Sequence, residues 1–184
     1  YLLMEKKLKN VSFLMPLFNS DLQLLKRSLD SIYQQTYKGN IIVYCILDGK
    51  NNKIKNFLLK FIETNYCNNR EIKLFVKENS GLSDTLNYGL NKITEDYIFR
   101  QDDDDFSLPQ RVDKVLNAFK NKNCIVVATS AIFKNGENYK VKNYPRKKFD
   151  ILLNLICGIN PICHPTVCFD YKKLNNLLGK KISA

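Results

Sequence analysis

Apolar residues along the chain occur in two patterns, short continuous runs and longer stretches with a helical repeat. Continuous runs predict strands buried on both faces, and apolar residues spaced three and four apart predict amphipathic helices. Strands are therefore expected at 11–15, 41–47, 72–76, 97–99 and 124–133, the last being the longest. Helices are expected at 22–32, capped by Ser20 or Asp21, at 54–62, at 82–93 and, after Pro109, at 112–119.

The rhythm changes after Phe133. Residues 134–138 predict a turn, 138–144 a returning strand, 149–156 a short helix and 162–169 another strand. We find no internal repeat and no low-complexity linker. The whole chain, 1–184, is therefore expected to form a single domain.

The alternation of strand and helix predicts an α/β fold with a doubly wound, mostly parallel, Rossmann-like sheet and helices on both faces. Such sheets bind ligands beyond the carboxyl ends of their strands. Three segments follow strands and should meet there: 16–19, 48–50 and 102–105.

The most informative of these segments holds four consecutive aspartates, Asp102 to Asp105. Adjacent carboxylates repel one another, so at least one pKa must rise or a cation must bind. Oxygen ligands alone suit Mg²⁺ or Mn²⁺, which usually bind substrate phosphates as well. A solvated acidic loop is the plainer alternative. The position of the run, directly after an apolar strand, favours the metal.

The net charge is +11, from 29 basic and 18 acidic residues. It would attract nucleic acid, anionic lipid or a diphosphate alike. No nucleic-acid-binding motif is present, so no nucleic-acid partner is expected. The first ten residues do not look like a secretory signal, and no apolar run is long enough to cross a bilayer. A cytoplasmic location is therefore expected.

The six cysteines include no CxxC pair and mostly lie in apolar runs, so we expect buried free thiols. A zinc site from Cys163, His164 and Cys168 is a weaker alternative. The chain also has neither a GxxxxGK[ST] loop nor a GxGxxG turn. Without a glycine-rich phosphate loop, a bound nucleotide diphosphate would need a metal held by carboxylates.

Four stretches then carry a family resemblance. They are VSFLMPLFN, ILDG, NSGLSDTLNYGLNKITEDYIFRQDDDDFSLPQR and NPICHPTVCF. In this order, over roughly residues 11 to 170, the chain resembles family-2 glycosyltransferases of GT-A fold, the bacterial enzymes that build capsule, exopolysaccharide and lipooligosaccharide. The third stretch is the most specific, because it includes the DxD-like acids.

The resemblance implies a set of site residues. Main-chain groups around Pro16, Leu17 and Phe18 would line the base pocket, and Asp48 would contact the base or ribose of a UDP-sugar. Asp102 would lie near the ribose and the Mn²⁺ or Mg²⁺ ion, which Asp104 would ligate. The roles of the three remaining residues are less defined: Asp103 in the variable position, Asp105 bracing the loop or reaching the sugar, and His164 near the phosphates or metal.

Two of these assignments have plainer readings. Asp48 precedes a glycine and could be a turn former, and His164 could be a packed or hydrogen-bonded histidine. This chain also lacks the paired acid and the following serine that are common in the family at Asp48.

The resemblance further implies inverting transfer of a sugar to a saccharide or lipid-linked saccharide acceptor. The family's catalytic base lies in an acidic motif downstream of the last stretch, and the chain ends at Ala184 before one. We therefore expect a donor-binding domain that is poorly active alone. Because the chain has a basic net charge, we also expect it to make peripheral contact with the anionic inner face of a membrane. A metal-dependent nucleotidyltransferase and a non-enzymatic basic binding module are the alternatives.

Overall fold

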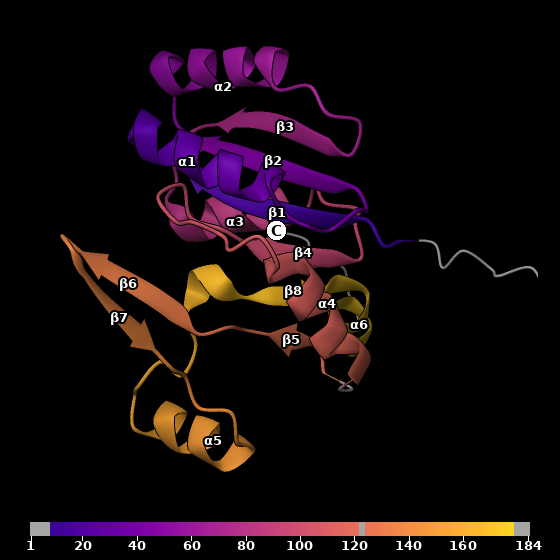
Figure 1. Cartoon of the computed structure of the whole chain (residues 1–184), viewed down its shortest axis with the longest axis vertical. Helices are drawn as coiled ribbons and strands as arrows, with labels where there is room; N and C mark the ends of the chain where they lie inside the picture. Colours follow the sequence, from indigo (N-terminus) through magenta and orange to yellow (C-terminus); the bar gives the residue numbers. More distant parts are fainter. Residues whose placement is uncertain (1–7, 122–123, 179–184) are drawn as a thin grey trace, which may run out of the picture.

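The computed structural model describes residues 8–121 and 124–178. Two expectations, about the first residues and about the end at Ala184, concern positions outside these ranges. A six-stranded sheet in the order β3-β2-β1-β4-β8-β5 forms the centre of the molecule, and a separate two-stranded hairpin projects from it (Figure 1). The mixed α/β architecture predicted from the sequence is confirmed.

Four neighbouring strands of the sheet are parallel, the fifth runs antiparallel to them, and the sixth, at the edge, runs antiparallel to the fifth. The parallel strands are β1 (Val11–Leu17), β2 (Ile41–Asp48), β3 (Arg70–Lys77) and β4 (Tyr97–Arg100). The fifth and sixth strands are β8 (Cys168–Asp170) and β5 (Val126–Val127). The mostly parallel sheet is as expected, because β1 and β2 are buried almost throughout.

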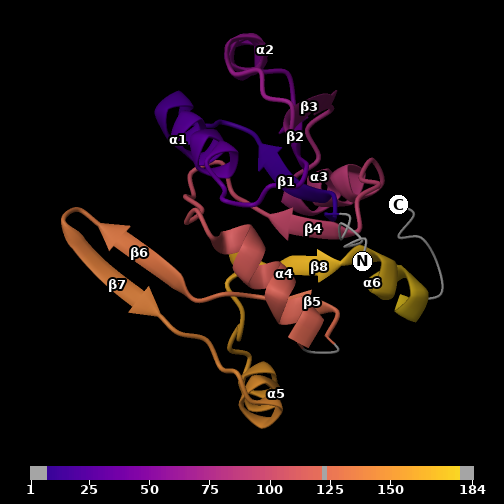
Figure 2. The same ribbon diagram turned by 45° about the vertical axis from the view of Figure 1, so that its right-hand side comes forward.

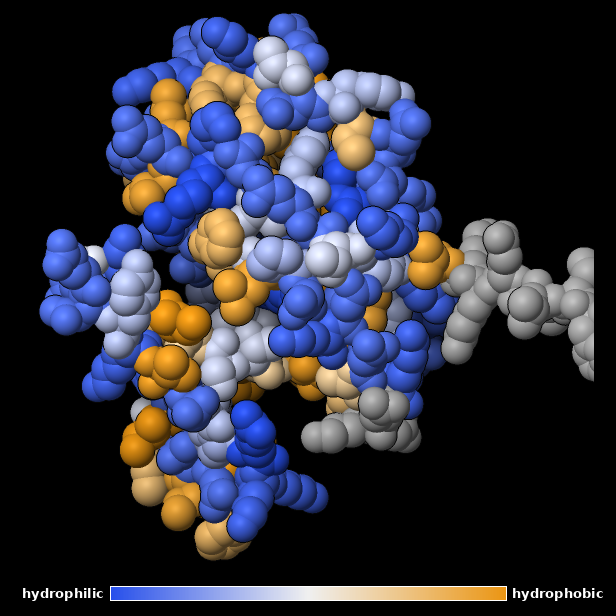
Figure 3. Space-filling view, viewed as in Figure 1, coloured by the Kyte–Doolittle hydropathy of each residue, from blue (hydrophilic) through white to orange (hydrophobic). Residues whose placement is uncertain are grey.

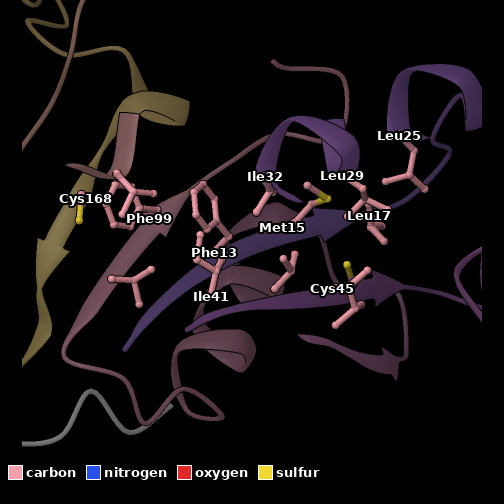
Figure 4. Close-up of a cluster of buried hydrophobic side chains, with 14 of the residues drawn as sticks. Phe13, Met15, Leu17, Leu25, Leu29, Ile32, Ile41, Cys45, Phe99 and Cys168 are labelled. Atoms are coloured by element: carbon pink, nitrogen blue, oxygen red, sulfur yellow. The ribbon is translucent and has the colours of Figure 1, made fainter. Parts of the chain in front are cut away.

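Helices cover both faces of the sheet. On the larger core lie α1 (Leu22–Tyr33), α2 (Asn52–Thr64) and α4 (Arg111–Asn121), and on the other face α3 (Leu82–Leu90) and α6 (Tyr171–Leu178). Figure 4 shows Leu25, Leu29 and Ile32 of α1 packed over β1. Asp21 caps α1 by accepting hydrogen bonds from the main-chain N–H groups of Gln23 and Leu24 at 2.8 and 3.1 Å.

Helix α3 lies unusually close to the sheet because of Gly89. A Cβ atom at this position would overlap the side chain of Leu14 on β1 and meet that of Ile46 on β2 at 3.0 Å. The absence of a side chain therefore lets α3 pack directly on the strands that lead to the predicted ligand edge.

The chain between Cys124 and Asn135 is not the single long strand that we expected. It divides into β5 and β6 (Ala131–Asn135), and β6 pairs with β7 (Asn138–Lys142) in the projecting hairpin. The break is fixed by Thr166, whose hydroxyl accepts from the N–H of Thr129 at 3.2 Å and donates to its carbonyl at 3.1 Å. These bonds draw the chain out of the sheet.

The strand predicted at 162–169 is also shorter. Residues His164–Thr166 form a single 3₁₀ turn, and only Cys168–Asp170 pair with the sheet. Pro165 has no N–H to contribute to a strand ladder, which explains the late start. The predicted short helix is confirmed as α5 (Lys148–Ile156).

All six cysteines are free, but the expectation that they are buried holds for only two of them. Cys45 and Cys168 lie in the core, whereas Cys67 and Cys157 are exposed.

Candidate functional site

A cavity of about 420 Å³ opens where β1, β2 and β4 end. The three segments that the sequence predicted to meet at this edge all contribute to it. Its lining residues are Pro16, Leu17, Phe18, Asn19, Asp48, Asn79, Gly81, Leu82, Thr85, Asp102 and Asp103. This cavity, the larger of the two described here, is therefore lined by six of the predicted site residues. Asp104, Asp105 and His164 do not line it.

The end of β1 and the residue that follows it give this cavity an aromatic wall. The side chains of Pro16 and Leu17 are buried in the sheet, so only their neighbour Phe18 offers a ring to solvent, with 50% of its surface exposed. An exposed aromatic ring beside a cavity can stack on a planar ligand group.

Asp48, at the end of β2, organises the opposite wall. Its Oδ1 accepts from Lys77 Nζ at 2.8 Å and from the N–H of Ser80 at 3.0 Å, and its Oδ2 accepts from the N–H of Gly81 at 2.9 Å. Burial acts to raise the pKa of Asp48, but these hydrogen bonds outweigh it and lower the pKa below its usual value. Asp48 is therefore an ionised anchor for the start of α3.

Gly81 suits this anchor because its φ of 91° lies in the left-handed region. That conformation presents its N–H to Asp48 at the point where α3 begins. Asp48 thus does more than form a turn, which was the plainer reading of the sequence.

The acidic loop is held from beneath by Gln101, which is 1% exposed. Its Nε2 donates to Ser28 Oγ at 3.1 Å and to the carbonyl of Asp105 at 3.0 Å. Its Oε1 accepts from Ser107 Oγ and from Arg111 Nη1, both at 2.6 Å. The side chain therefore joins both ends of the loop to the interior.

Ser28 completes this support by donating to the carbonyl of Asp102 at 3.0 Å. Sequence reasoning missed this network. The available signal was that Ser28 and Ser31 interrupt the apolar face of α1, although a core-facing position usually holds an apolar residue. Two buried serines on that face indicate polar partners beneath the helix.

Arg111 is the cation of the network. Burial lowers its pKa to about 10, with Cys168, Asp105 and Cys163 acting in the opposite direction, so the guanidinium stays charged at neutral pH. It donates to the carbonyls of Arg100 and Pro165 at 2.8 and 2.9 Å.

The four aspartates occupy different environments. Asp102, Asp103 and Asp105 are half-buried, whereas Asp104 is exposed. Asp102 forms an ion pair with Arg100. Burial, and then the neighbouring carboxylates Asp102 and Asp104, raise the pKa of Asp105 to about 6. Burial also raises the pKa of Asp103, and the neighbouring carboxylates Asp104 and Asp102 act in the same direction. The like-charge repulsion expected from the sequence is therefore present.

The lining of the larger cavity is acidic, with the carboxylates of Asp48, Asp102 and Asp103. Among its lining residues there is no lysine, arginine or histidine, although the chain has a net charge of +11. Within the described part of the chain, no group of three or more His, Cys, Asp and Glu side chains is arranged to enclose a metal. A metal here would thus be held by one or two carboxylates and by the oxygens of a ligand, as is usual for Mg²⁺.

A second, smaller cavity of about 240 Å³ lies on the other side of α3. Its lining residues are Leu14, Ser83, Leu86, Asn87, Leu90, Ile98, Arg100, His164 and Phe169. His164 is exposed at its rim, in the 3₁₀ turn rather than in the strand that we predicted. Burial, followed by the nearby Arg100, lowers the pKa of His164. His164 is therefore mostly neutral at pH 7.

Comparisons with known proteins identify the family of the chain. The profile described as Glycosyl transferase family 2 matches residues 12–177. An uncharacterized glycosyltransferase of Rickettsia typhi is 30% identical over 180 residues, which cover 94% of this chain and 52% of the relative. The UDP-Gal:alpha-D-GlcNAc-diphosphoundecaprenol beta-1,3-galactosyltransferase of Escherichia coli is 28% identical, covering 86% of this chain and 57% of that protein. The chain spans about half the length of the curated relatives it matches.

Two solved structures share the fold. The mannosyltransferase PcManGT of Pyrobaculum calidifontis, in complex with GDP-Man and Mn²⁺, superposes with a TM-score of 0.67 at 18% identity, covering 92% of this chain and 46% of that one. TarS 1–349 of S. aureus, in complex with UDP-GlcNAc, gives 0.68 at 17% identity, with coverages of 91% and 47%. Identities this low support the GT-A fold alone.

Among the described residues, no helix is both long and apolar enough to span a bilayer.

Proposed function

The chain belongs to glycosyl transferase family 2, and we propose that it binds a nucleotide-sugar donor in the larger cavity for transfer of the sugar to a saccharide acceptor. The observation that carries this proposal is the meeting of Phe18, Asp48 and Asp102 around one cavity at the carboxyl edge of a parallel sheet. An aromatic wall suits the base, and the carboxylates suit the ribose and a metal-bound diphosphate.

A UDP-sugar is the donor we favour. Phe18 would stack on the base, and Asp48 would accept a hydrogen bond from the base or ribose with its remaining lone pairs. This assignment is supported by the UDP-GlcNAc in the structural neighbour TarS, whereas the neighbour PcManGT holds GDP-Man. A hexose is accordingly the expected transferred group.

Mn²⁺ or Mg²⁺ is the proposed cofactor, with Asp102 and Asp104 as its protein ligands. When bound, the ion would neutralise the charge that develops on the departing diphosphate. Asp103 lines the cavity whereas Asp104 does not, so Asp103 is the alternative to Asp104 as the second protein ligand. Asp105 would brace the loop through its carbonyl bond to Gln101.

The proposed reaction is a direct displacement with inversion. The acceptor hydroxyl oxygen forms a bond to the anomeric carbon as the bond to the diphosphate oxygen breaks, and a carboxylate base takes the hydroxyl proton. Asp170 is poorly placed for this role, because it pairs with Tyr97 at the start of β4, whereas the cavity lies at the end of that strand. We propose that residues 1–184 form the donor domain and that the base lies outside the described residues.

The smaller cavity would receive the sugar or the acceptor. Its leucines offer an apolar wall, and Ser83, Asn87 and His164 offer polar groups at the rim. The acceptor is proposed to be a saccharide, lipid-linked as the name of the Escherichia coli relative states for that enzyme, in bacterial surface polysaccharide synthesis.

Calorimetric titration of the protein with UDP, with and without Mn²⁺, tests the donor site. Binding should require Mn²⁺ and should be abolished by Asp102→Asn and by Asp104→Asn. If Asp103→Asn abolishes UDP binding and Asp104→Asn does not, Asp103 is the second protein ligand of the metal. Asp84→Asn is the matched control, because Asp84 is an exposed acid in the first turn of α3 that does not line the cavity.

The same titration separates the alternatives. A non-enzymatic basic module would bind UDP equally well or better once the aspartates are neutralised. A nucleotidyltransferase would need basic groups around the phosphates, and the lining residues of the larger cavity include none. UDP binding that is unchanged by the removal of Mn²⁺ and by Asp102→Asn would contradict the proposed function.

A further inference from the structure

Residues 131–159 form an arm that stands apart from the body of the protein (Figures 1 and 2). The arm consists of the β6–β7 hairpin, a connecting segment and α5. None of its residues belongs to either hydrophobic core, and α5 has no buried residue. The side chains of the arm are therefore available to contact a binding partner.

The surface of this arm is unusually apolar. Of the 21 exposed large apolar side chains among the described residues, 10 lie on the arm. The most exposed on α5 are Phe149 at 71% and Ile156 at 74%. Helix α5 carries apolar residues around most of its circumference, which is typical of a helix that is covered. Apolar surface gathered in this way marks an interaction site.

The hairpin adds apolar residues with lysines between them. Ile132 lies opposite Val141, and Lys134 lies opposite Tyr139 two positions along, so these four side chains share one face. On the other face Phe133 lies opposite Lys140. Lysine stems can lie along apolar surface while their ammonium groups reach a polar layer above it. Figure 3 shows the resulting mixture of hydrophobic and hydrophilic residues over the hairpin and α5.

The charge of the arm identifies the partner. It carries six basic residues against two acidic ones, Glu137 and Asp150, and all eight are exposed. The basic residues are Lys134, Lys140, Lys142, Arg146, Lys147 and Lys148. In the described ranges, none of these six forms an ion pair. An apolar helix next to unpaired cations complements an anionic bilayer, with the apolar groups below the headgroups and the cations among them.

We propose that this basic and apolar arm docks the protein on an anionic lipid bilayer, with α5 lying in the interface. The inference rests on the arm alone and is independent of the donor chemistry. It does bear on orientation, because the arm leaves the body on the side toward which the carboxyl end of β4 points (Figures 1 and 2). The bilayer would then lie on the side where the larger cavity opens.

Co-sedimentation with phosphatidylcholine vesicles, with and without phosphatidylglycerol, measures the charge contribution. The variant Arg146→Ala/Lys147→Ala/Lys148→Ala should bind the anionic vesicles about 100-fold more weakly. The matched control is Lys53→Ala/Lys55→Ala/Lys60→Ala on α2, which removes the same charge from equally exposed positions. This control should bind nearly as well as the original protein. Equal losses in both variants would show attraction by net charge alone and would overturn the proposal.

The depth of α5 can be measured directly, because the chain contains no tryptophan. Ile156→Trp introduces a single reporter, whose emission should shift to the blue on anionic vesicles and resist aqueous quenchers. Tyr66→Trp, at a site 87% exposed on the body, should show neither change. If the Ile156→Trp emission shifts with protein concentration in the absence of lipid, the arm covers a second copy of the chain and the membrane proposal is wrong. An unchanged emission on vesicles would also refute it.

Discussion

Arg100 and Asp102 form an ion pair that joins the two cavities, because Arg100 lines the smaller one and Asp102 lines the larger. The pair is asymmetric: the Arg100 side chain is 5% exposed and that of Asp102 is 32% exposed. Nε and Nη1 of Arg100 are buried without a hydrogen-bond partner among the described residues. Asp102 is therefore the main compensation for the buried charge of Arg100.

Replacing the cation tests this dependence. Arg100→Leu removes the partner of Asp102 and should lower the free energy of unfolding by roughly 1–3 kcal/mol. It should also weaken Mn²⁺-dependent UDP binding, because Asp102 loses its fixed orientation. Urea unfolding and calorimetry measure the two effects. Arg27→Leu, at an exposed position on α1, is the control and should change neither.

Gln101 should be as important for the loop as the aspartates themselves. Gln101→Leu keeps a similar volume but removes the acceptor of the Ser107 hydroxyl and one of the two acceptors of Arg111 Nη1, which keeps only Ser107 Oγ. We expect a loss of about 2–4 kcal/mol in the free energy of unfolding, since several buried polar groups lose their partner at once. Urea unfolding measures it, and Gln23→Leu on the exposed side of α1 serves as the comparison. A loss below that of Gln23→Leu would contradict the network.

Asp48 gives a pH dependence whose sign follows from its lowered pKa. A carboxyl group with a folded-state pKa below its unfolded value stabilises the protein above the unfolded value. That stability is lost as the pH falls through the folded-state pKa. Asp48→Asn should therefore be less stable than the original protein at pH 7, and the difference should shrink below the ordinary value of 3.8.

Thermal unfolding between pH 7 and pH 3 measures that difference for Asp48→Asn. Asp30→Asn is a suitable comparison, because its ion pair with Lys26 lies at the surface of α1. A difference for Asp48→Asn that stays constant with pH would show that its carboxylate charge has no part in holding α3.

Gly89→Ala should reverse the usual effect of this substitution. In an exposed helix alanine is about 1 kcal/mol more favourable than glycine. Here the added Cβ would overlap the buried side chain of Leu14, so that side chain must shift or α3 must move away from the sheet. We expect a loss of roughly 1–3 kcal/mol in the free energy of unfolding. A gain in denaturant midpoint would mean that α3 does not pack as closely as described.

The sequence was sufficient for those elements whose pattern is local. Runs such as IIVYCIL identify buried strands, and the order of strands and helices then places segments 16–19, 48–50 and 102–105 at one edge. The sequence was insufficient where the structure depends on contacts between residues that are far apart along the chain. The division between β5 and β6 depends on Thr129 meeting Thr166, which is 37 residues away.

The same limit applies within the candidate site. Four identical aspartates give no local sign of which side chain enters a cavity, and the structure brings in Asp102 and Asp103 while Asp104 stays outside. That choice is made by the turn in which the N–H of Asp105 donates to the carbonyl of Asp102, and by the support from Gln101. The ligand roles of these aspartates remain predictions for the titrations proposed above.

Helix α3 is a shared wall, since Gly81, Leu82 and Thr85 face the larger cavity and Ser83, Leu86 and Asn87 face the smaller one. A rigid wall cannot tilt toward one compartment without receding from the other. A molecule that displaces α3 on entering one cavity must therefore alter the affinity of the other cavity for its own ligand. Thermodynamic reciprocity makes this change in binding free energy equal in both directions. The helix thus provides a physical basis for coupling between the two cavities.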